Sequence, residues 1–349
     1  MAYQAVLTDP SEGREHLVRL WLDNLPVRGD ARAKLDWLYL DGPAGRGEVF
    51  LLRDERGAPV GCAGITRREL WRGDQPLKTA LLADLAIDRA HRTGMPALVL
   101  QRATKRHVDA AYDLSYGFPN ANAVALHRRI GYHVLGAMER YVRVLRHSRY
   151  LERKYGRPIV ARAAGAVIDG AKLAVRTARA FAPSRAAELV WLDDVDPRFD
   201  RLWEQSRGAW GLAGRRDAAF LRWRFLRKPD EKVAVAALCE KKGGALRAYA
   251  IVGGAPGDFA LIADAFGSIE AQGDLLTLLA PALTTRGHTA IGMRFLGDPR
   301  MTEMLRAHSF SLRDAHRTVI VNPGATCPID PAIVRDTARW YLTDLDEDT

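Results

Sequence analysis

Two stretches in the first half of the chain contain side chains whose types and spacing suit chemistry. In "LLADLAID", Asp84 and Asp88 are four residues apart and share one face of an extended strand. In "GFPNANAVALHRRIGY", Asn120 precedes a helical pattern and His127 follows seven residues later. A histidine has a reference pKa of about 6.5, so it can exchange a proton near neutral pH. These residues can therefore move protons or bind a ligand.

The second stretch resembles a motif of a known enzyme superfamily. From Asn120 it reads N-x-x-A-x-x-L-H-x-x-x-G-Y, which is similar to the late-helix motif N-x-x-A-x-x-L-Y-x-x-x-G-F of the GNAT acyltransferases. The resemblance implies that Asn120 binds the pantetheine arm of acetyl-CoA or another acyl-CoA. It also implies that His127, at the position of the family's tyrosine, protonates the leaving thiolate. Two plainer roles stay open: a helix N-cap for Asn120 and a helix-face histidine without chemistry for His127.

The resemblance gives the first stretch a role as well. By the family pattern, the strand backbone from Leu85 to Ile87 pairs with the pantetheine amides, and a nearby backbone N–H stabilises the oxyanion. Members of the superfamily often use a carboxylate to take a proton from the amine, which makes Asp84 the candidate base. A base is needed because an alkylammonium, with a pKa of about 10, must lose its proton before it attacks. The alternative for Asp84 is a structural aspartate that caps a turn or pairs with an arginine.

A third feature of the superfamily is a pyrophosphate loop, Q/R-x-x-G-x-G/A, at the start of a helix. Small residues there let backbone N–H groups approach phosphates, and the helix dipole adds attraction. The corresponding stretch begins with arginine and ends with alanine, but methionine replaces the central glycine and a proline follows it. Gly94 can supply the tight turn one residue earlier. The expected phosphate-binding set is Arg92, Thr93, Gly94, Met95 and Ala97.

The elements that position these residues are predicted to occur twice. "LDWLYLDGP" (35–43) and "LRWRFLRKP" (221–229) share the pattern Leu-x-Trp-x-aromatic-Leu-x-x-Pro. Each is followed by three predicted strands, a helix, a strand, a helix and a strand. This order predicts an α+β (layered α/β) fold class with two tandem GNAT-like domains, each a mixed, mostly antiparallel sheet flanked by helices.

Four regions follow from the repeat. They are an acyl-CoA-binding domain (1–145), a basic amphipathic linker helix (146–185), a degenerate second GNAT-like domain (186–330), and a C-terminal helix with an acidic tail (331–349). The second domain is interpreted as degenerate because it lacks the phosphate-loop pattern. In addition, its "GDPR" places Arg300 against the Asn120 of "GFPN". Its expected task is to shape the acceptor pocket or to stabilise the first domain.

The repeated phrase changes its charge between the two copies. Asp36 and Asp41 in the first copy correspond to Arg222 and Arg227 in the second, and Arg224 is added. We therefore predict that Arg222 and Arg224 bind a carboxylate or phosphate on the acceptor.

The basic charge of the chain is concentrated in the middle segment. Residues 141–186 contain eleven lysines and arginines against two acidic residues, whereas the whole chain has a net charge of +10. The segment is interpreted as a linker helix that packs one face on a domain, or as an interfacial helix on an anionic membrane surface. It has no aromatic stacking pattern or base-reading motif, which argues against nucleic acid.

The composition limits the class of protein. Hydrophobic residues make up 48% and charged residues 27%, as in soluble globular proteins. The chain has no recognisable signal peptide and no long apolar run, so a cytoplasmic location is expected, with peripheral contact at the inner membrane face as the alternative. Three scattered cysteines without a CxxC pair argue against disulfides and against a metal site.

The favoured function is an N-acyltransferase that transfers an acyl group from acyl-CoA to the amine of a small molecule, an amino sugar or an amino acid at the domain junction. One alternative is an aminoacyl-tRNA-dependent transferase similar to the Fem peptidyltransferases. The other is a non-catalytic binding protein with a tandem GNAT fold. The sequence makes no prediction of the oligomeric state.

Overall fold

The computed structural model describes residues 3–93, 95–146, 187–241, 244–255, 259–313 and 317–348. The basic helix predicted over 146–185 lies outside these residues, except for Arg146. Within the described part of the chain, no helix is long and apolar enough to cross a membrane.

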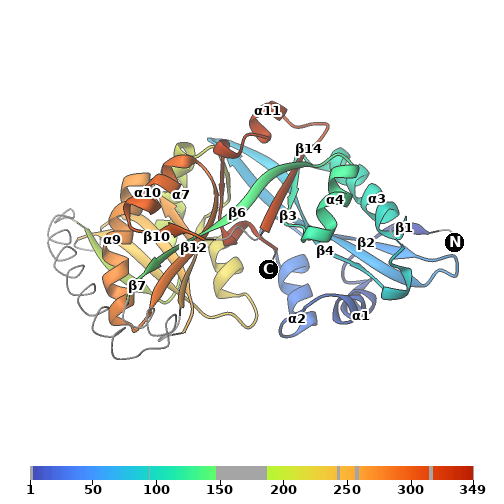
Figure 1. The fold of residues 1–349 in the computed structure, drawn as a ribbon, viewed down its shortest axis with the longest axis horizontal. Helices are drawn as coiled ribbons and strands as arrows, with labels where there is room; N and C mark the ends of the chain where they lie inside the picture. Colours follow the sequence, from blue (N-terminus) through green and yellow to red (C-terminus); the bar gives the residue numbers. More distant parts are fainter. Residues whose placement is uncertain are drawn as a thin grey trace.

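The N-terminal half forms a sheet that is covered by helices on both faces. Helices α1 and α2 lie on one face, and α3 and α4 lie on the other (Figure 1). Its elements are β1 (Gln4–Thr8), α1 (Arg14–Asn24), α2 (Ala31–Leu35), a π-helical turn (Asp36–Leu40), β2 (Glu48–Arg53), β3 (Pro59–Arg72), β4 (Gln75–Ile87), a 3-10 turn (Arg89–His91), α3 (Met95–Ala111), β5 (Leu114–Gly117), α4 (Ala121–Arg129) and β6 (His133–Val144).

The C-terminal half has a similar order of elements and adds a terminal segment. Its main elements are β7 (Ala187–Leu192), α7 (Pro197–Ser206), β8 (Leu212–Gly214), α8 (Ala218–Leu221), a π-helical turn (Arg222–Leu226), β9 (Val233–Glu240), β10 (Leu246–Gly253), β11 (Phe259–Gly267), α9 (Ile269–Thr285), β12 (Ala290–Gly297), α10 (Pro299–Ala307), β13 (Ser311–Leu312) and β14 (Arg317–Pro323). The terminal segment contains α11 (Pro331–Val334), β15 (Trp340–Leu342) and 3-10 turns at Thr337–Arg339 and Asp344–Asp346, and another 3-10 turn follows α7 (Arg207–Ala209).

The predicted fold class is confirmed. In the described part of the chain, fifteen strands join into one mixed sheet, in which most neighbouring strands are antiparallel. Three strand pairs are parallel: β4 with β5, β11 with β12, and β8 with β15. Helices flank the sheet in both halves, as the alternation of strand and helix patterns predicts.

The two halves exchange strands, and the sequence pattern does not show this exchange. β6 spans roughly 40 Å at about 3.3 Å per residue, and only its first part stays in its own half. Residues 133–138 of β6 pair with β14, and residues 139–144 pair with β12 of the other half. β14 in turn pairs with both β5 and β6. The predicted limits 1–145 and 186–330 therefore do not enclose two separate sheets, because one strand from each side completes the other's sheet.

The repeated phrase forms the contact between the halves. The rings of Trp37 and Trp223 stack with centroids 5.3 Å apart. Trp37 Nε1–H donates to the carbonyl oxygen of Trp223 at 2.7 Å, and Trp223 Nε1–H donates to that of Trp37 at 2.8 Å. Such reciprocity is typical of a twofold contact, in which the same patch is used on both sides. The two copies of the phrase therefore bind each other.

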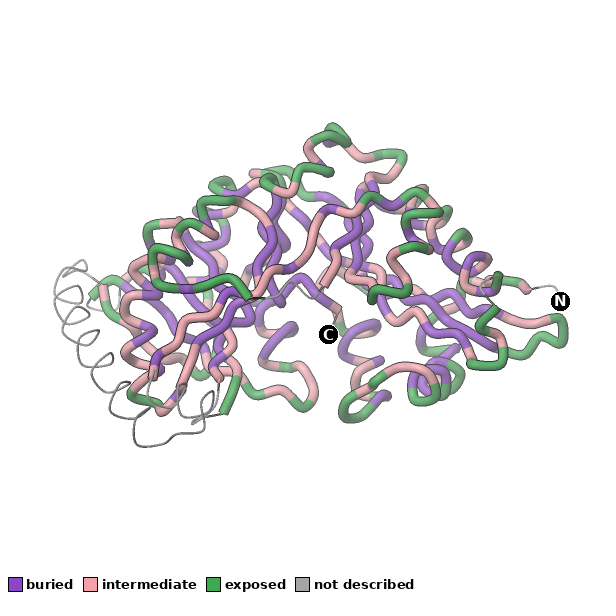
Figure 2. Tube along the Cα trace, in the orientation of Figure 1, coloured by how far each residue is buried: buried purple, intermediate pink, exposed green. Residues whose placement is uncertain are grey.

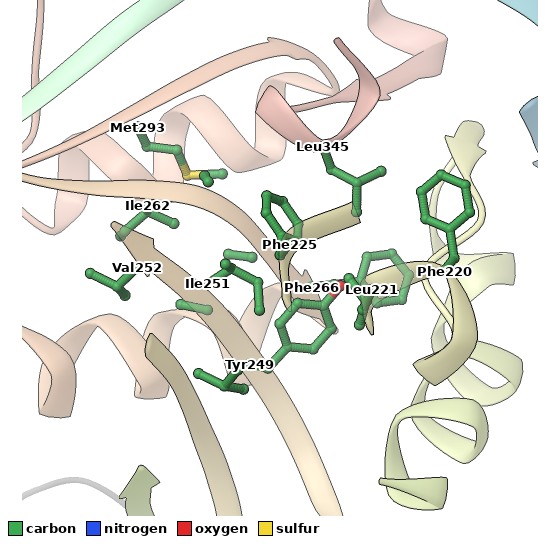
Figure 3. Close-up of a cluster of buried hydrophobic side chains, with 14 of the residues drawn as sticks. Phe220, Leu221, Phe225, Tyr249, Ile251, Val252, Ile262, Phe266, Met293 and Leu345 are labelled. Atoms are coloured by element: carbon green, nitrogen blue, oxygen red, sulfur yellow. The ribbon is translucent and has the colours of Figure 1, made fainter. Parts of the chain in front are cut away.

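The core is shared as well. One hydrophobic cluster contains α1 residues such as Trp21 together with Phe225 and Phe266 of the C-terminal half. The buried regions run continuously through the sheet and into the C-terminal segment (Figure 2). In the close-up of this cluster, Leu345 of the terminal segment lies with Phe225 and Phe266 (Figure 3).

The region predicted as a C-terminal helix and acidic tail is different in the structure. Its α-helix has only four residues, and Asp344, Asp346 and Glu347 are buried. One buried and two half-buried arginines pair with the carboxylates of this segment. The fully buried Arg216 donates to Asp264 at 3.2 Å and to Asp346 at 2.8 Å. The acidic pattern predicts charge correctly, but it does not reveal that cationic partners lie inside the protein.

Candidate functional site

The sheet of the N-terminal half has a gap between β4 and β5, next to the start of α4. The parallel ladder between β4 and β5 has four pairs and ends at Leu82 opposite Gly117. β4 continues to Ile87, so its last five residues form no ladder with β5. This free edge includes Leu85, and α4 begins just after β5. An extended ligand with amide groups can pair with such an edge as an added strand would.

A bulge turns Asp84 toward α2. The β3–β4 register shifts between Cys62 and Gly64, and Asp84 takes a φ of +50°. Its carboxylate accepts from Lys34 Nζ at 2.6 Å and from the Tyr39 hydroxyl at 2.8 Å. The Asp84 side chain is only 6% exposed. The ion-pair partner of Asp84 is therefore a lysine and not an arginine. The role of Asp84 as a base stays a prediction.

The charge of Asp84 shifts the pKa values of three neighbouring groups. Burial alone would lower the pKa of Lys34, but the charge of Asp84 and its hydrogen bond outweigh burial and raise it. Burial, followed by the charge of Asp84, raises the pKa of Tyr39 well above its usual value. Burial and the same charge also raise the pKa of Asp348. The end of the terminal segment therefore lies close enough to Asp84 to sense its charge.

Asn120 and His127 are both part of α4. The exposed Asn120 is the N-cap, and its side-chain oxygen accepts from Ala123 N at 3.0 Å. Among the described residues, its amide nitrogen has no hydrogen-bond partner. His127 is 4% exposed, and its Nδ1 bonds to the carbonyl oxygen of Ala123 at 2.8 Å. Burial lowers the pKa of His127, although the bond to Ala123 opposes this shift. His127 is therefore mostly neutral at pH 7, which limits its capacity as the predicted acid.

This pKa shift leads to a prediction for stability. The unfolded state binds a proton on His127 more readily than the folded state does. The contribution of neutral His127 to the free energy of unfolding is therefore fully present above about pH 6.5, and it is lost as the pH falls from there toward the folded pKa. We expect His127→Leu to reduce this acid-side loss in urea unfolding measured at pH 7.5 and 5.5. The exposed His133, replaced by glutamine, is the control. An unchanged pH dependence in His127→Leu would contradict the shift.

The predicted phosphate loop has mixed features. Met95 is the first residue of α3 and is 61% exposed, and Thr93 is exposed. Ala97 lies in the first turn, and Gly94 is outside the described residues. Arg92 turns away from the loop: its Nε donates to Ile87 O at the end of β4 at 2.9 Å, and its Nη2 donates to Asn24 at the end of α1 at 2.9 Å. The remaining donors for a phosphate are the N–H groups at the start of α3, a helix of seventeen residues.

The two arginines predicted to bind the acceptor occupy structural positions. Arg222 donates to Asp194 at 3.0 Å, and its role toward an acceptor stays a prediction. Arg224 is 2% exposed and donates to the backbone oxygens of Asp344 at 2.9 Å and Leu345 at 3.0 Å. The guanidinium of Arg224 therefore holds the terminal segment inside the protein, and its role toward an acceptor stays a prediction.

The position that corresponds to Asn120 in the C-terminal half is Asp298 and not Arg300. Asp298 is the N-cap of α10, as Asn120 is of α4. Tyr132 N bonds to His127 O at the end of α4, and Phe310 N bonds to Leu305 O at the end of α10. Leu305 therefore occupies the place of His127. Aligning the two prolines of "GDPR" and "GFPN" shifted this correspondence by two residues.

In the C-terminal half, the terminal segment fills the equivalent gap. The β11–β12 ladder ends at Ile262 opposite Met293, and β15 then pairs with β12 at Leu296 and Gly297. The hydroxyl of Tyr341 bonds to Ala265 O at 2.5 Å. A Cβ at Gly297 would lie 1.9 Å from Trp340 O, so only glycine allows this approach. The chain itself thus occupies the second gap.

No group of three or more His, Cys, Asp or Glu residues in the described part of the chain is arranged to hold a metal ion.

The sequence analysis did not identify Lys34 and Tyr39, the two partners of Asp84. Tyr39 belongs to the repeated phrase, but its aromatic character indicated packing alone. Lys34 stands on a short helix with no motif around it.

No model of a known family matches this chain, and no curated protein matches its sequence. Solved structures do resemble it. A protein of unknown function from Enterococcus faecalis V583, described as a probable N-acyltransferase, aligns over 93% of this chain and 73% of its own at a TM-score of 0.66 and 11% identity. A GCN5-related N-acetyltransferase from Anabaena variabilis aligns over 92% of this chain and 73% of its own, with a TM-score of 0.65 and 14% identity. Another GCN5-related N-acetyltransferase, from Kribbella flavida, aligns over 98% of this chain and 81% of its own, with a TM-score of 0.58 and 14% identity. The chain therefore has the fold of GCN5-related N-acetyltransferases.

Proposed function

We propose that this protein transfers an acyl group from an acyl-CoA, with acetyl-CoA as the first candidate, to the amine of a small molecule. The open gap beside β4 is the observation on which this proposal depends. In the N-terminal half, a free strand edge, a helix start and an amide side chain lie around one gap. The second gap is filled by β15 and Tyr341, so one donor per chain is expected.

Residues of the N-terminal half would hold the donor. The β4 edge around Leu85 would pair with the pantetheine amides, and the amide nitrogen of Asn120 would donate to the same arm. The N–H groups at the start of α3 would face the pyrophosphate. Pro96 lacks an N–H, so this helix start offers one donor fewer than a fully matching loop.

The acceptor amine would approach from the α2 side, where Asp84 lies. In that position Asp84 would take the proton of the ammonium, directly or through a water molecule, and the amine would then attack the thioester. Lys34 and Tyr39 would fix the carboxylate. His127 would serve the thiolate only in its protonated fraction, which its lowered pKa keeps small at neutral pH.

Donor binding can be tested with a variant that preserves the helix cap. Aspartate caps α10 at the equivalent position, so Asn120→Asp should keep α4 intact while removing the amide donor. Acetyl-CoA at 100 times its Kd should stabilise the wild type by about 2.7 kcal/mol. We expect Asn120→Asp to lower the affinity about 10-fold, as for one lost hydrogen bond. Calorimetric titration would measure the affinity, and urea unfolding with and without acetyl-CoA would measure the stabilisation.

The matched control is Asp298→Asn in the C-terminal half, which should leave acetyl-CoA affinity unchanged. If acetyl-CoA at millimolar concentration neither shifts the melting temperature nor gives heat on titration, the proposal is wrong. The alternative of a non-catalytic binding protein would then gain support. One observation already favours that alternative, because both carboxylate oxygens of Asp84 have partners.

A further inference from the structure

Arg68 is a buried cation, and one edge of its guanidinium forms no hydrogen bond with the described residues. It lies on β3 and is 4% exposed. Its guanidinium carbon lies 4.9 Å from the ring centroid of Trp223 and 5.9 Å from that of Phe220. Its Nη1 donates to the carbonyl oxygen of Arg67 at 3.2 Å. Among the described residues, Nε and Nη2 have no hydrogen-bond partner, although both atoms are buried.

A second unsatisfied group lies beside it. Thr66 is fully buried, and its hydroxyl has no hydrogen-bond partner among the described residues. Thr66 and Arg68 are two residues apart on one strand, so their side chains lie on the same face of the sheet. Buried polar groups are nearly always satisfied in native proteins, so three unsatisfied atoms on one strand face indicate a missing partner.

Arg67 and Arg216 differ from Arg68, because each has a carboxylate partner. Arg67 points to the opposite face of β3 and donates to Glu48 at 2.7 Å. Arg216 is buried to the same degree and has two carboxylate partners. For Arg68, burial lowers the pKa to about 10, and the charge of Arg224 acts in the same direction. Arg68 is still charged at neutral pH, so an anion would be attracted to it.

Arg68 lies at the junction of the two halves, and a series of contacts connects it to Asp84. It stacks on Trp223, which stacks on Trp37. Tyr39, two residues after Trp37, donates to Asp84. The charge of Asp348 acts on Arg68, and the charge of Asp84 acts on Asp348. An acceptor whose amine meets Asp84 could thus place a second group toward Arg68.

We propose that Arg68, with Thr66, binds a carboxylate of the acceptor, so that the acceptor is an amine that also bears a carboxylate, as an amino acid does. This proposal rests on the proposed acyl transfer at Asp84. Nε and Nη2 form one edge of the guanidinium and match the two oxygens of a carboxylate. A phosphate would bring about 1.5 to 2 negative charges into this buried site, and its desolvation would cost more than that of a carboxylate with a single charge.

The test compares matched acids and amides. The probes are glycine, L-serine, L-leucine and L-glutamate, each beside its α-carboxamide. Thiol release from acetyl-CoA gives kcat/KM for each pair, and thermal shift without acetyl-CoA gives binding alone. For at least one pair, we expect the wild type to prefer the acid about 10- to 100-fold, as for a charged hydrogen bond. We expect Arg68→Gln to lose this preference, and Arg68→Lys to restore it only in part, because lysine lacks the fork.

Arg67→Gln is the control, because it changes the same strand on the opposite face and should keep the preference for the acid. Arg68→Met should raise the melting temperature of the ligand-free protein by a few degrees, since it removes an unpaired buried charge. The proposal is overturned if acids and amides give equal responses in the wild type. It is also overturned if Arg68→Gln keeps the preference while Arg68→Met lowers the melting temperature, because Arg68 would then be purely structural.

The thermal-shift measurement separates this proposal from the proposed function. If acetyl-CoA neither binds nor reacts but acids still stabilise the wild type more than Arg68→Gln, the acyl transfer is wrong and the carboxylate site stands. If acetyl-CoA reacts with acids and amides equally, the acyl transfer stands and the carboxylate site is wrong.

Discussion

Replacing Arg216 with methionine is expected to lower the free energy of unfolding by about 3–5 kcal/mol, as for a buried ion pair that loses one partner. The guanidinium is fully buried and bonds to Asp264 and Asp346, which are 0% and 1% exposed. Without it, two carboxylates face each other inside the protein. The charges of these two aspartates outweigh burial and raise the pKa of Arg216, so the cation is firmly held in the native state.

The loss should depend on pH, because Asp264 can become neutral. Burial already raises the pKa of Asp264 although Arg216 opposes it, and removing Arg216 would raise it further. A group whose folded pKa is raised stabilises the folded state at low pH and loses that contribution as the pH rises. We therefore expect urea unfolding to show a smaller loss at pH 5 than at pH 8. Arg215→Met, at a half-buried neighbour, should cost about 1 kcal/mol or less. Equal losses in both variants would contradict the network.

Asp84→Asn is expected to lower the acyl-transfer rate constant about 10²- to 10⁴-fold, which is the usual contribution of a general base. The change keeps the side-chain volume and a hydrogen bond to Tyr39, but it removes the proton acceptor. Acetyl-CoA affinity should change little, because the donor is expected to contact the β4 backbone and not the Asp84 carboxylate. Single-turnover kinetics would separate the chemical step from binding.

Two controls make this result specific. Asp88→Asn changes the carboxylate four residues on, which pairs with Arg19 and Asn24, and should leave the rate within about twofold. Lys34→Gln removes the partner of Asp84 and tests the ion pair alone. If Asp84→Asn loses stability and acetyl-CoA binding to the same extent as Lys34→Gln while the rate constant is unchanged, Asp84 is structural.

The local elements and the fold class could be predicted from the sequence, because each depends on short-range patterns. The repeated phrase around Trp37 and Trp223 indicated equivalent places in two halves, and the N-cap alternative for Asn120 followed from Pro119 and the helical pattern after it. These signals depend on spacing within a few residues, which periodicity reports directly.

The strand exchange and the buried charges could not be predicted in this way. β6 has the same alternating pattern whichever strand lies beside it, so its two partners are invisible in its own residues. Arg216 and Arg224 look like surface arginines because the carboxylates that accept from Arg216 and the carbonyls that accept from Arg224 are about 50 to 130 residues away. The same distance hid the role of the terminal segment, which was predicted to be a tail.

The strand exchange also determines when the polypeptide can reach its native state. Asn322 on β14 pairs with Ser115 on β5, more than two hundred residues earlier in the chain. During synthesis, the N-terminal sheet therefore stays incomplete until β14 leaves the ribosome, with a strand edge open to other partners. Contacts this distant in sequence slow folding, because the chain loses the entropy of loop closure before the stabilising contacts form. The two halves consequently reach the native state as one cooperative unit, and neither half is a natural fragment to express alone.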